Sequence, residues 1–381
     1  MKKTIVVLIG FYMLQGYSAP LISNVKAEPI APWGEMAVSW NVSNSSSKDA
    51  AEYSGYLVMS NVISSVTYWK KVDVPQKDGA CRTYIDKNMY SGKWDKSDQW
   101  VFQIRLFLKY CIVDFSAGDS ALSYPISYLT DEPKYGWTEE YKTTKLVLRL
   151  IEPGTFKMSG RAGDRWTDYN IRLTKPYYIG IFEVTQKQYN LVTGENPSCY
   201  MGDRRPVENV SYKELRGLYN WPTDKRLPTG FLGKLIKRTG GIFDLPTEAQ
   251  WEYACRAGTE SRFNNGGDTE EDLALLGRYG GNVADGRGGY SEHTEVGSYL
   301  PNNWGIYDMH GNVWEWCRDW VWNSPNEDMV DPLGNESGSE RCYRGNSWRM
   351  SDYTYFSSSS MSSTKPENKY EALGFRVVKE L

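Results

Sequence analysis

The residues best suited to chemistry gather in one short run, Asp308-Met309-His310-Gly311-Asn312-Val313-Trp314-Glu315-Trp316-Cys317. It holds two carboxylates, an imidazole and a thiol beside a Gly-Asn turn former. Large aromatic residues and turn formers at this density do not suit the interior of a helix or strand, so we expect a tight loop. A lone histidine in such a loop, here His310, is expected to pack and hydrogen-bond rather than to catalyse.

Other groups for metal or acid–base chemistry are sparse. The chain has 2 histidines and 6 cysteines, and no two cysteines have CxxC spacing. This pattern argues against a zinc site and excludes an iron site built from three histidines. We expect His293 to lie in a polar loop without a function, and Asp203 and Glu208 to lie in solvated loops without an acid–base partner.

The cysteines also bear on disulfide formation. Six cysteines in an exported chain can pair in many ways, and the sequence does not choose among them. Cys81 and Cys111 stand alone in the first third of the chain, which makes them natural partners. The other four lie further along.

Composition limits the class of protein. A chain of 381 residues is long enough for two domains, and its 40% hydrophobic and 24% charged residues are typical of soluble globular proteins. The aromatic share of 14% is high, which fits core packing for most rings and a stacking surface for some. A net charge of -3 gives no electrostatic case for binding nucleic acid or an anionic membrane.

The N-terminal segment, residues 1–27, is typical of a secretory signal peptide. Two lysines precede an apolar core over residues 5–14, which is too short to cross a bilayer. Cleavage is expected near Ser18 or after Ala27. Without a lipobox cysteine or a transmembrane segment, the chain is predicted to be secreted or periplasmic.

Two domains are expected after this signal. Alternating runs such as residues 36–42 and 100–106, separated by polar turns, predict a small immunoglobulin-like β-sandwich over residues 28–128. A linker is expected over residues 129–144, and the second domain over residues 145–381.

The second domain is expected to carry three helices, over residues 186–191 and 231–237 and from residue 248 onward. The third is the best marked, because Thr247 and Gln250 have the spacing of a capping box before a helical apolar face.

Motifs over residues 146–378 resemble those of the formylglycine-generating enzyme family, also called the sulfatase-modifying factor family. Besides the run at 308–317, they occur in the family's order as Phe182-Glu183-Val184-Thr185, Arg205-Pro206-Val207, Leu245-Pro246-Thr247-Glu248-Ala249-Gln250-Trp251-Glu252-Tyr253-Ala254, Asn303-Trp304-Gly305, Arg344-Gly345-Asn346-Ser347-Trp348 and Gly374-Phe375-Arg376. The resemblance implies an irregular α+β domain, related to C-type lectins, with long loops around a small sheet.

The resemblance also implies where an oxidase would hold its metal. In active members, two cysteines after the RGGSW motif bind copper(I) and activate oxygen, which oxidises a substrate cysteine to formylglycine; soft thiolates suit Cu(I). The corresponding positions here are Met350 and Tyr355, and neither can form a thiolate. Copper is therefore not expected, and the chain resembles a pseudoenzyme. Cys255 and Cys317 are expected as buried thiols or as a structural disulfide.

The resemblance also implies calcium as a cofactor. Carried over from the family, Asp308 and Glu315 would supply carboxylates and the backbones of Gly311 and Val313 carbonyls, and hard oxygen ligands on a turned loop suit Ca²⁺. A second site would use the Asn282 side chain with the carbonyls of Val283 and Tyr290.

Three hypotheses for function remain. The first is an exported, non-catalytic binding module for a peptide or glycan, with Tyr353, Tyr355 and Phe356 as stacking residues of a ligand loop. The second is a formylglycine-generating oxidase with rearranged ligands, acting on a cysteine of sulfatase-type substrates. The third is a ligand-diversified domain whose variation would fall over residues 349–370.

Overall fold

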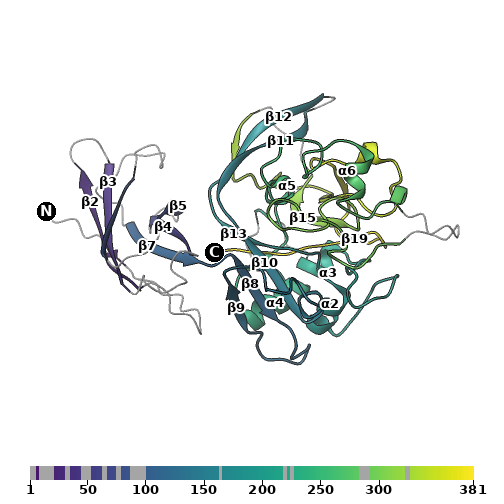
Figure 1. Cartoon of the computed structure of the whole chain (residues 1–381), viewed down its shortest axis with the longest axis horizontal. Helices are drawn as coiled ribbons and strands as arrows, with labels where there is room; N and C mark the ends of the chain where they lie inside the picture. Colours follow the sequence, from purple (N-terminus) through teal and green to yellow (C-terminus); the bar gives the residue numbers. More distant parts are fainter. Residues whose placement is uncertain are drawn as a thin grey trace. The chain divides into compact units, whose positions relative to one another are not determined.

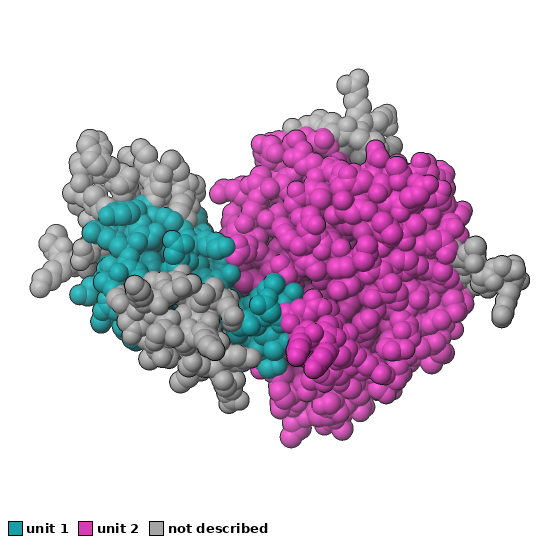
Figure 2. Space-filling model, in the orientation of Figure 1, with its two compact units in different colours: residues 1–110, 127–131 teal, residues 111–126, 132–381 magenta. Residues whose placement is uncertain are grey.

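The computed structural model describes two compact units (Figure 2). Unit 1 comprises residues 1–110 and 127–131, and unit 2 comprises residues 111–126 and 132–381. The ranges that the structure describes are residues 6–7, 21–30, 35–43, 53–61, 67–73, 79–85, 100–162, 165–217, 221–223, 227–282, 292–321 and 327–381. Within them, no helix has both the length and the apolarity to cross a membrane.

Unit 1 is built from two sheets (Figure 1). One has the order β1 (Val6–Val7), β7 (Trp100–Phe107), β4 (Ser54–Asn61) and β5 (Thr67–Val72); the other has β2 (Leu21–Ile30), β3 (Glu35–Ser43) and β6 (Gly79–Ile85). Alternate residues of both sheets share one core, which includes Trp40, Leu57 and Phe102. The expected all-β first region is therefore present.

The start of β2 bears on the predicted signal boundary. Ile22, Val25 and Ala27 are buried in the core of unit 1, so cleavage after Ala27 would remove most of this strand. Cleavage near Ser18 leaves β2 whole. Apart from Val6 and Val7, the predicted signal core lies outside the described residues.

The expected domain boundary at residue 128 also differs. Strand β8 (Tyr110–Asp114) lies beside β10 (Lys145–Ile151) in a sheet of unit 2, because Cys111, Ile112 and Val113 are apolar on both faces and need cover on both. The expected linker 129–144 belongs to unit 2 from Glu132 onward.

Three sheets lie wholly or mainly in unit 2. The six-stranded sheet has the order β14 (Phe243–Asp244), β20 (Val378–Lys379), β13 (Tyr177–Gly180), β10, β8 and β9 (Ile126–Leu129). The three-stranded sheet is β11 (Gly154–Ala162), β12 (Arg165–Leu173) and β16 (Met329–Val330). The four-stranded sheet is β18 (Met361–Thr364), β17 (Arg341–Arg344), β15 (Trp314–Trp320) and β19 (Leu373–Gly374).

The three expected helices are α2 (Gln186–Thr193), α4 (Gly230–Thr239) and α5 (Glu248–Arg256). The predicted capping box is present at the start of α5: the Thr247 side chain accepts from the Gln250 amide, and the Gln250 side chain accepts from the Thr247 amide. The buried face of α5 packs against β11, β15 and β17. Three short helices were not expected: α1 (Glu140–Thr143), α3 (Tyr212–Arg216) and α6 (Glu270–Ala274).

All six cysteines are free thiols. The expected pair is not formed; Cys81 is a free thiol in β6 and Cys111 is a free, buried thiol in β8. Cys255 and Cys317 are buried thiols, one of the two alternatives expected for them.

Candidate functional site

The run at 308–317 is only half a loop. Residues 308–313 turn sharply, with positive φ at Asp308, Gly311 and Asn312, but Trp314–Trp320 is strand β15. The expectation of a loop throughout was wrong, because tryptophan fits the pleated surface of a strand and finds partners on both faces. Trp316 is fully buried against Tyr212 and Tyr343.

Glu315 is held by a buried guanidinium. Arg376 Nε lies 2.6 Å from Glu315 Oε2 and Arg376 Nη2 lies 2.5 Å from Oε1, while Trp251 Nε1 donates to Oε2 at 2.6 Å. Both side chains of the ion pair are fully buried. Each carboxylate oxygen is therefore engaged in charge-assisted hydrogen bonds.

Two more carboxyl groups surround this pair. Asp308 Oδ2 accepts from the Gly297 amide at 2.6 Å, and Glu183 accepts from the Asn312 side chain at 2.7 Å. Burial raises the pKa of Asp308 to about 6 and that of Glu183 well above its usual range. Asp308 Oδ1 is buried without a hydrogen-bond partner among the described residues.

Two of the expected calcium ligands, Glu315 and Asn282, already have protein partners. Glu315 has no oxygen free, and Asn282 uses both side-chain atoms locally, accepting from the Tyr279 amide at 3.0 Å and donating to Gly277 O at 2.8 Å. Val283 and Tyr290 lie outside the described residues. Within the described part of the chain, no group of three or more His, Cys, Asp or Glu residues is arranged to hold a metal ion.

His310 is a packing residue, as expected. It is fully buried, its Nε2 accepts from the Asn264 amide at 3.2 Å, and its ring meets Phe263 edge-on. Burial lowers the pKa of His310 to about 3, so the imidazole is neutral at physiological pH.

Sequence reasoning missed a buried cluster around Glu208. The carboxyl group is fully buried rather than solvated, and its Oε1 accepts from the amides of Cys199 at 2.5 Å and Tyr200 at 3.0 Å. His293, also buried, places Nε2 3.5 Å from the same oxygen, and Tyr200 packs edge-on against both His293 and Trp348. No local pattern signals this cluster, because His293 and Trp348 are far from Glu208 in the sequence.

The positions of the family's cysteine pair lie at a pocket and on an exposed turn. Met350 is half-buried and helps to line a cavity of about 230 Å³. Three aromatic rings, one cation and several small polar groups make up its wall: Trp314, Tyr343, Asn346, Ser347, Arg349, Met350, Tyr370, Ala372 and Leu373. Tyr355 is 63% exposed at the end of the 3-10 turn η4 (Tyr353–Tyr355) and is not among these lining residues.

One of the three expected ligand-loop residues does not face solvent. Phe356 is fully buried and packs with Phe263, Leu273, Leu276 and Tyr279, because it is the apolar anchor that closes this turn. The prediction that Phe356 stacks on a ligand is therefore wrong, whereas Tyr355 is accessible.

Arg262 holds this turn in place. Its guanidinium donates to the carbonyls of Phe356 at 2.8 Å and Tyr353 at 3.2 Å, also donates to that of Thr354, and lies over the Tyr353 ring. Asp352 caps the turn by accepting from the Thr354 amide at 2.9 Å. These hydrogen bonds fix the turn, which lowers the entropic cost of binding a ligand to it.

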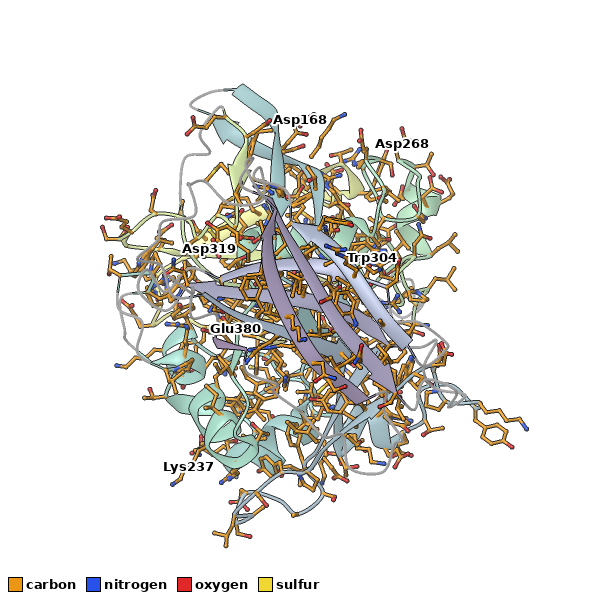
Figure 3. The ribbon with its side chains drawn as sticks, turned by 90° about the vertical axis from the view of Figure 1, so that its left-hand side faces the viewer. Asp168, Lys237, Asp268, Trp304, Asp319 and Glu380 are labelled. Carbon is orange, nitrogen blue, oxygen red and sulfur yellow. The ribbon has the colours of Figure 1, made fainter. Side chains whose placement is uncertain are left out.

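Ion pairs of two buried arginines, Arg344 and Arg318, hold the four-stranded sheet. Arg344, the last residue of β17, contacts Glu248 at 2.6 Å and Glu252 at 2.8 Å. Arg318 of β15 bridges Asp244 and Glu380, each at 2.9 Å. The side chain of Glu380 can be located in Figure 3.

Comparison with known proteins places residues 137–381 in a family. These residues match the family model described as "Sulfatase-modifying factor enzyme 1-like domain". Among curated relatives, the chaperone protein LppX of Paenibacillus barcinonensis is 32% identical over 210 residues, which cover 47% of this chain and 73% of that protein. The formylglycine-generating enzyme of Streptomyces coelicolor is 38% identical over 146 residues, covering 35% of this chain and 45% of that enzyme.

Two solved structures share the fold of unit 2. Treponema denticola variable protein 1 aligns with a TM-score of 0.53 and 26% identity, covering 62% of this chain and 96% of that chain. PvdO from Pseudomonas aeruginosa aligns with a TM-score of 0.50 and 25% identity, covering 62% of this chain and 95% of that chain.

Proposed function

Because this chain belongs to the sulfatase-modifying factor family, we propose that it keeps the family's scaffold as an exported binding module without oxidase activity. The observation that carries the proposal is Met350. It replaces the first thiol at the wall of an aromatic pocket, and Tyr355, in place of the second, points into solvent. Copper(I) chemistry needs soft thiolate ligands, which a thioether and a phenol do not replace.

The pocket wall suits a peptide or glycan ligand. Trp314, Tyr343 and Tyr370 contribute aromatic rings to the wall, and Asn346 and Ser347 contribute small polar residues. Such a mixture of rings and a few polar groups is typical of ligand sites. The likeness to a protein named as a chaperone supports a polypeptide ligand.

A second candidate is the oxidase itself. Relatives named formylglycine-generating enzyme support it, including the Streptomyces coelicolor protein at 38% identity. This reading requires copper ligands other than Met350 and Tyr355. A third candidate, a ligand-diversified domain, is supported by the likeness to a Treponema protein named as variable.

An oxidase assay separates the first two candidates. The full chain, loaded with Cu(I), is incubated in air with a peptide containing the sulfatase-type CxPxR motif, and mass spectrometry looks for the aldehyde. We expect no aldehyde from the natural chain. The variant Met350→Cys/Tyr355→Cys restores both thiols and is the matched positive control. Aldehyde formed by the natural chain would refute the proposal.

A binding assay then tests the pocket. Peptide and glycan arrays are probed with the natural chain, with Trp314→Ala and with Tyr355→Ala. As a matched control we use Tyr135→Ala, since Tyr135 is 82% exposed and does not line the pocket. Ligands that survive Trp314→Ala and Tyr355→Ala unchanged would rule out this pocket and turn as the binding site.

Calcium binding remains part of the proposal and has its own test. The ion would approach Asp308 Oδ1, the one unpartnered oxygen of the predicted carboxylates, and Glu315 would have to release Arg376 to join it. Calorimetric titration with Ca²⁺ after treatment with a chelator measures this directly. Equal heats from the natural chain and from Asp308→Asn would exclude the site.

A further inference from the structure

Cys317 and Cys342 stand on neighbouring strands of the four-stranded sheet. Strands β15 and β17 are antiparallel, with Glu315 opposite Arg344 and Trp316 opposite Tyr343. Continued by one residue, this register would place Cys317 opposite Cys342. The register shifts between Trp316 and Trp320, so the two thiols come directly after the last regular pair, Trp316 and Tyr343.

The two side chains share a face and a core. Side chains alternate along a strand, so Cys317 projects to the same face as Glu315, and Cys342 to the same face as Arg344. Both cysteines are fully buried and belong to one hydrophobic cluster with Trp251. Neighbouring Cβ atoms across an antiparallel pair lie about 4.5–5.5 Å apart, close to the separation that a disulfide spans.

The contacts of both thiols are weak in the reduced chain. Cys317 Sγ lies 3.9 Å from Glu315 O, and Cys342 Sγ lies 3.6 Å from Glu248 Oε2. A thiol is a poor hydrogen-bond donor, so little is lost if these contacts give way. Glu248 keeps its partner Arg344, whose Nη2 lies 2.6 Å away.

We propose that Cys317 and Cys342 form a cross-strand disulfide when the chain folds under oxidising conditions. The oxidant is a disulfide, such as oxidised glutathione. One cysteine thiolate attacks it and releases one small thiol, and the second cysteine then attacks the mixed disulfide and releases the other. Two protein thiols thus become one S–S bond, and the two electrons and two protons leave on the small thiols.

The thiol–disulfide exchange must take place while the chain folds, before the two cysteines are buried. Neither sulfur is accessible, and burial raises the pKa of both thiols well above the usual range, so the folded chain offers no thiolate to an oxidant. Once made, the bond would close the segment between β15 and β17, which includes β16, and restrict the unfolded chain.

Peptide mapping of the full chain tests the proposal. The chain is denatured, reduced and refolded in a mixture of reduced and oxidised glutathione, and a parallel sample is refolded with reductant alone. Free thiols are alkylated in denaturant before digestion and mass spectrometry. We expect a peptide pair joined through Cys317 and Cys342 in the oxidised sample only, with two fewer alkylated thiols and a higher thermal midpoint.

Three single variants control the result. Cys317→Val and Cys342→Val should each abolish the linked peptide and the gain in thermal midpoint, whereas Cys255→Val, at a buried thiol of the same core, should keep both. The peptide map of the natural chain remains a valid test even if a variant does not fold. Alkylation of Cys317 and Cys342 to the same extent as Cys255 in oxidised, folded protein would overturn the proposal, as would either one linked to another cysteine.

Discussion

At the scale of single residues, Arg376 holds several buried groups of the site together. Its guanidinium satisfies both oxygens of Glu315 and also donates to the carbonyls of Gly180 at 2.9 Å and Tyr307 at 3.0 Å. It therefore ties the six-stranded sheet to strand β15. A buried cation with this many acceptors leaves several of them unpaired when it is removed.

We expect Arg376→Met to lower the free energy of unfolding by about 3–5 kcal/mol, because Glu315 would remain buried and charged without its partner. Urea unfolding followed by tryptophan fluorescence measures the change. Arg349→Met breaks an ion pair whose arginine is 58% exposed and should change little. An equal loss in both variants would contradict the argument.

His310 should make the fold sensitive to acid. Its folded pKa of about 3 lies below the ordinary 6.5, so the neutral imidazole contributes stability that is full above pH 6.5 and is lost as pH falls toward 3. Between pH 7 and pH 4.5 we expect a loss of about 2–3 kcal/mol from this group.

The measurement is the difference in unfolding free energy between the natural chain and His310→Gln at both pH values. This difference cancels Asp308 and Asp319, whose pKa values, raised to about 6 and about 7, give a slope of the opposite sign. Parallel pH profiles of the two proteins would show that His310 is not responsible.

At the scale of elements, the start of α5 sets the position of Glu248 and Trp251, which hold Arg344 and Glu315. We expect Thr247→Ala to cost about 1 kcal/mol, because its hydroxyl accepts from the Gln250 amide at 3.1 Å. Thr229→Ala is the matched control, since Thr229 begins α4 without a side-chain capping bond. Chemical denaturation measures the loss in unfolding free energy for both variants. Equal losses would count against the capping argument.

Elements with a local signal were predictable, and those made by distant partners were not. The capping box of α5 and Gly240 at the end of α4 could be read directly from the sequence. The capping box of Ser211 and Glu214 is also local and could have located α3. Strand β15 was missed because its partners β17 and β19 are remote in sequence, and aromatic density alone does not separate loop from strand.

The candidate site divides in the same way. Met350 and Tyr355 follow from their spacing after Trp348, whereas the pocket combines β15 with residues 343–350 and 370–373. No residue-level pattern announces that assembly. Similarly, the burial of Phe356 depends on a cluster that includes Phe263 and Leu273, far away in sequence.

At the scale of the molecule, strand β8 decides which fragment folds alone. We expect residues 109–381 to form a soluble, cooperatively melting protein, because they contain every strand of the six-stranded sheet. Residues 137–381, the span of the family match, lack β8 and β9 and leave β10 as an apolar edge, which favours aggregation. Size-exclusion chromatography and thermal melting of both fragments make the comparison; a soluble, equally stable shorter fragment would contradict it.

The path of the chain between the units has a further consequence for inheritance. The chain passes from unit 1 to unit 2 after Tyr110, returns at Ser127 and leaves again after Asp131. A break in the gene at residue 137, where the family match begins, would therefore leave β8 and β9 behind. A recombination event at that point would separate β10 from its sheet partner, so the family domain should be inherited together with the strands from Tyr110 onward rather than as a cassette of residues 137–381.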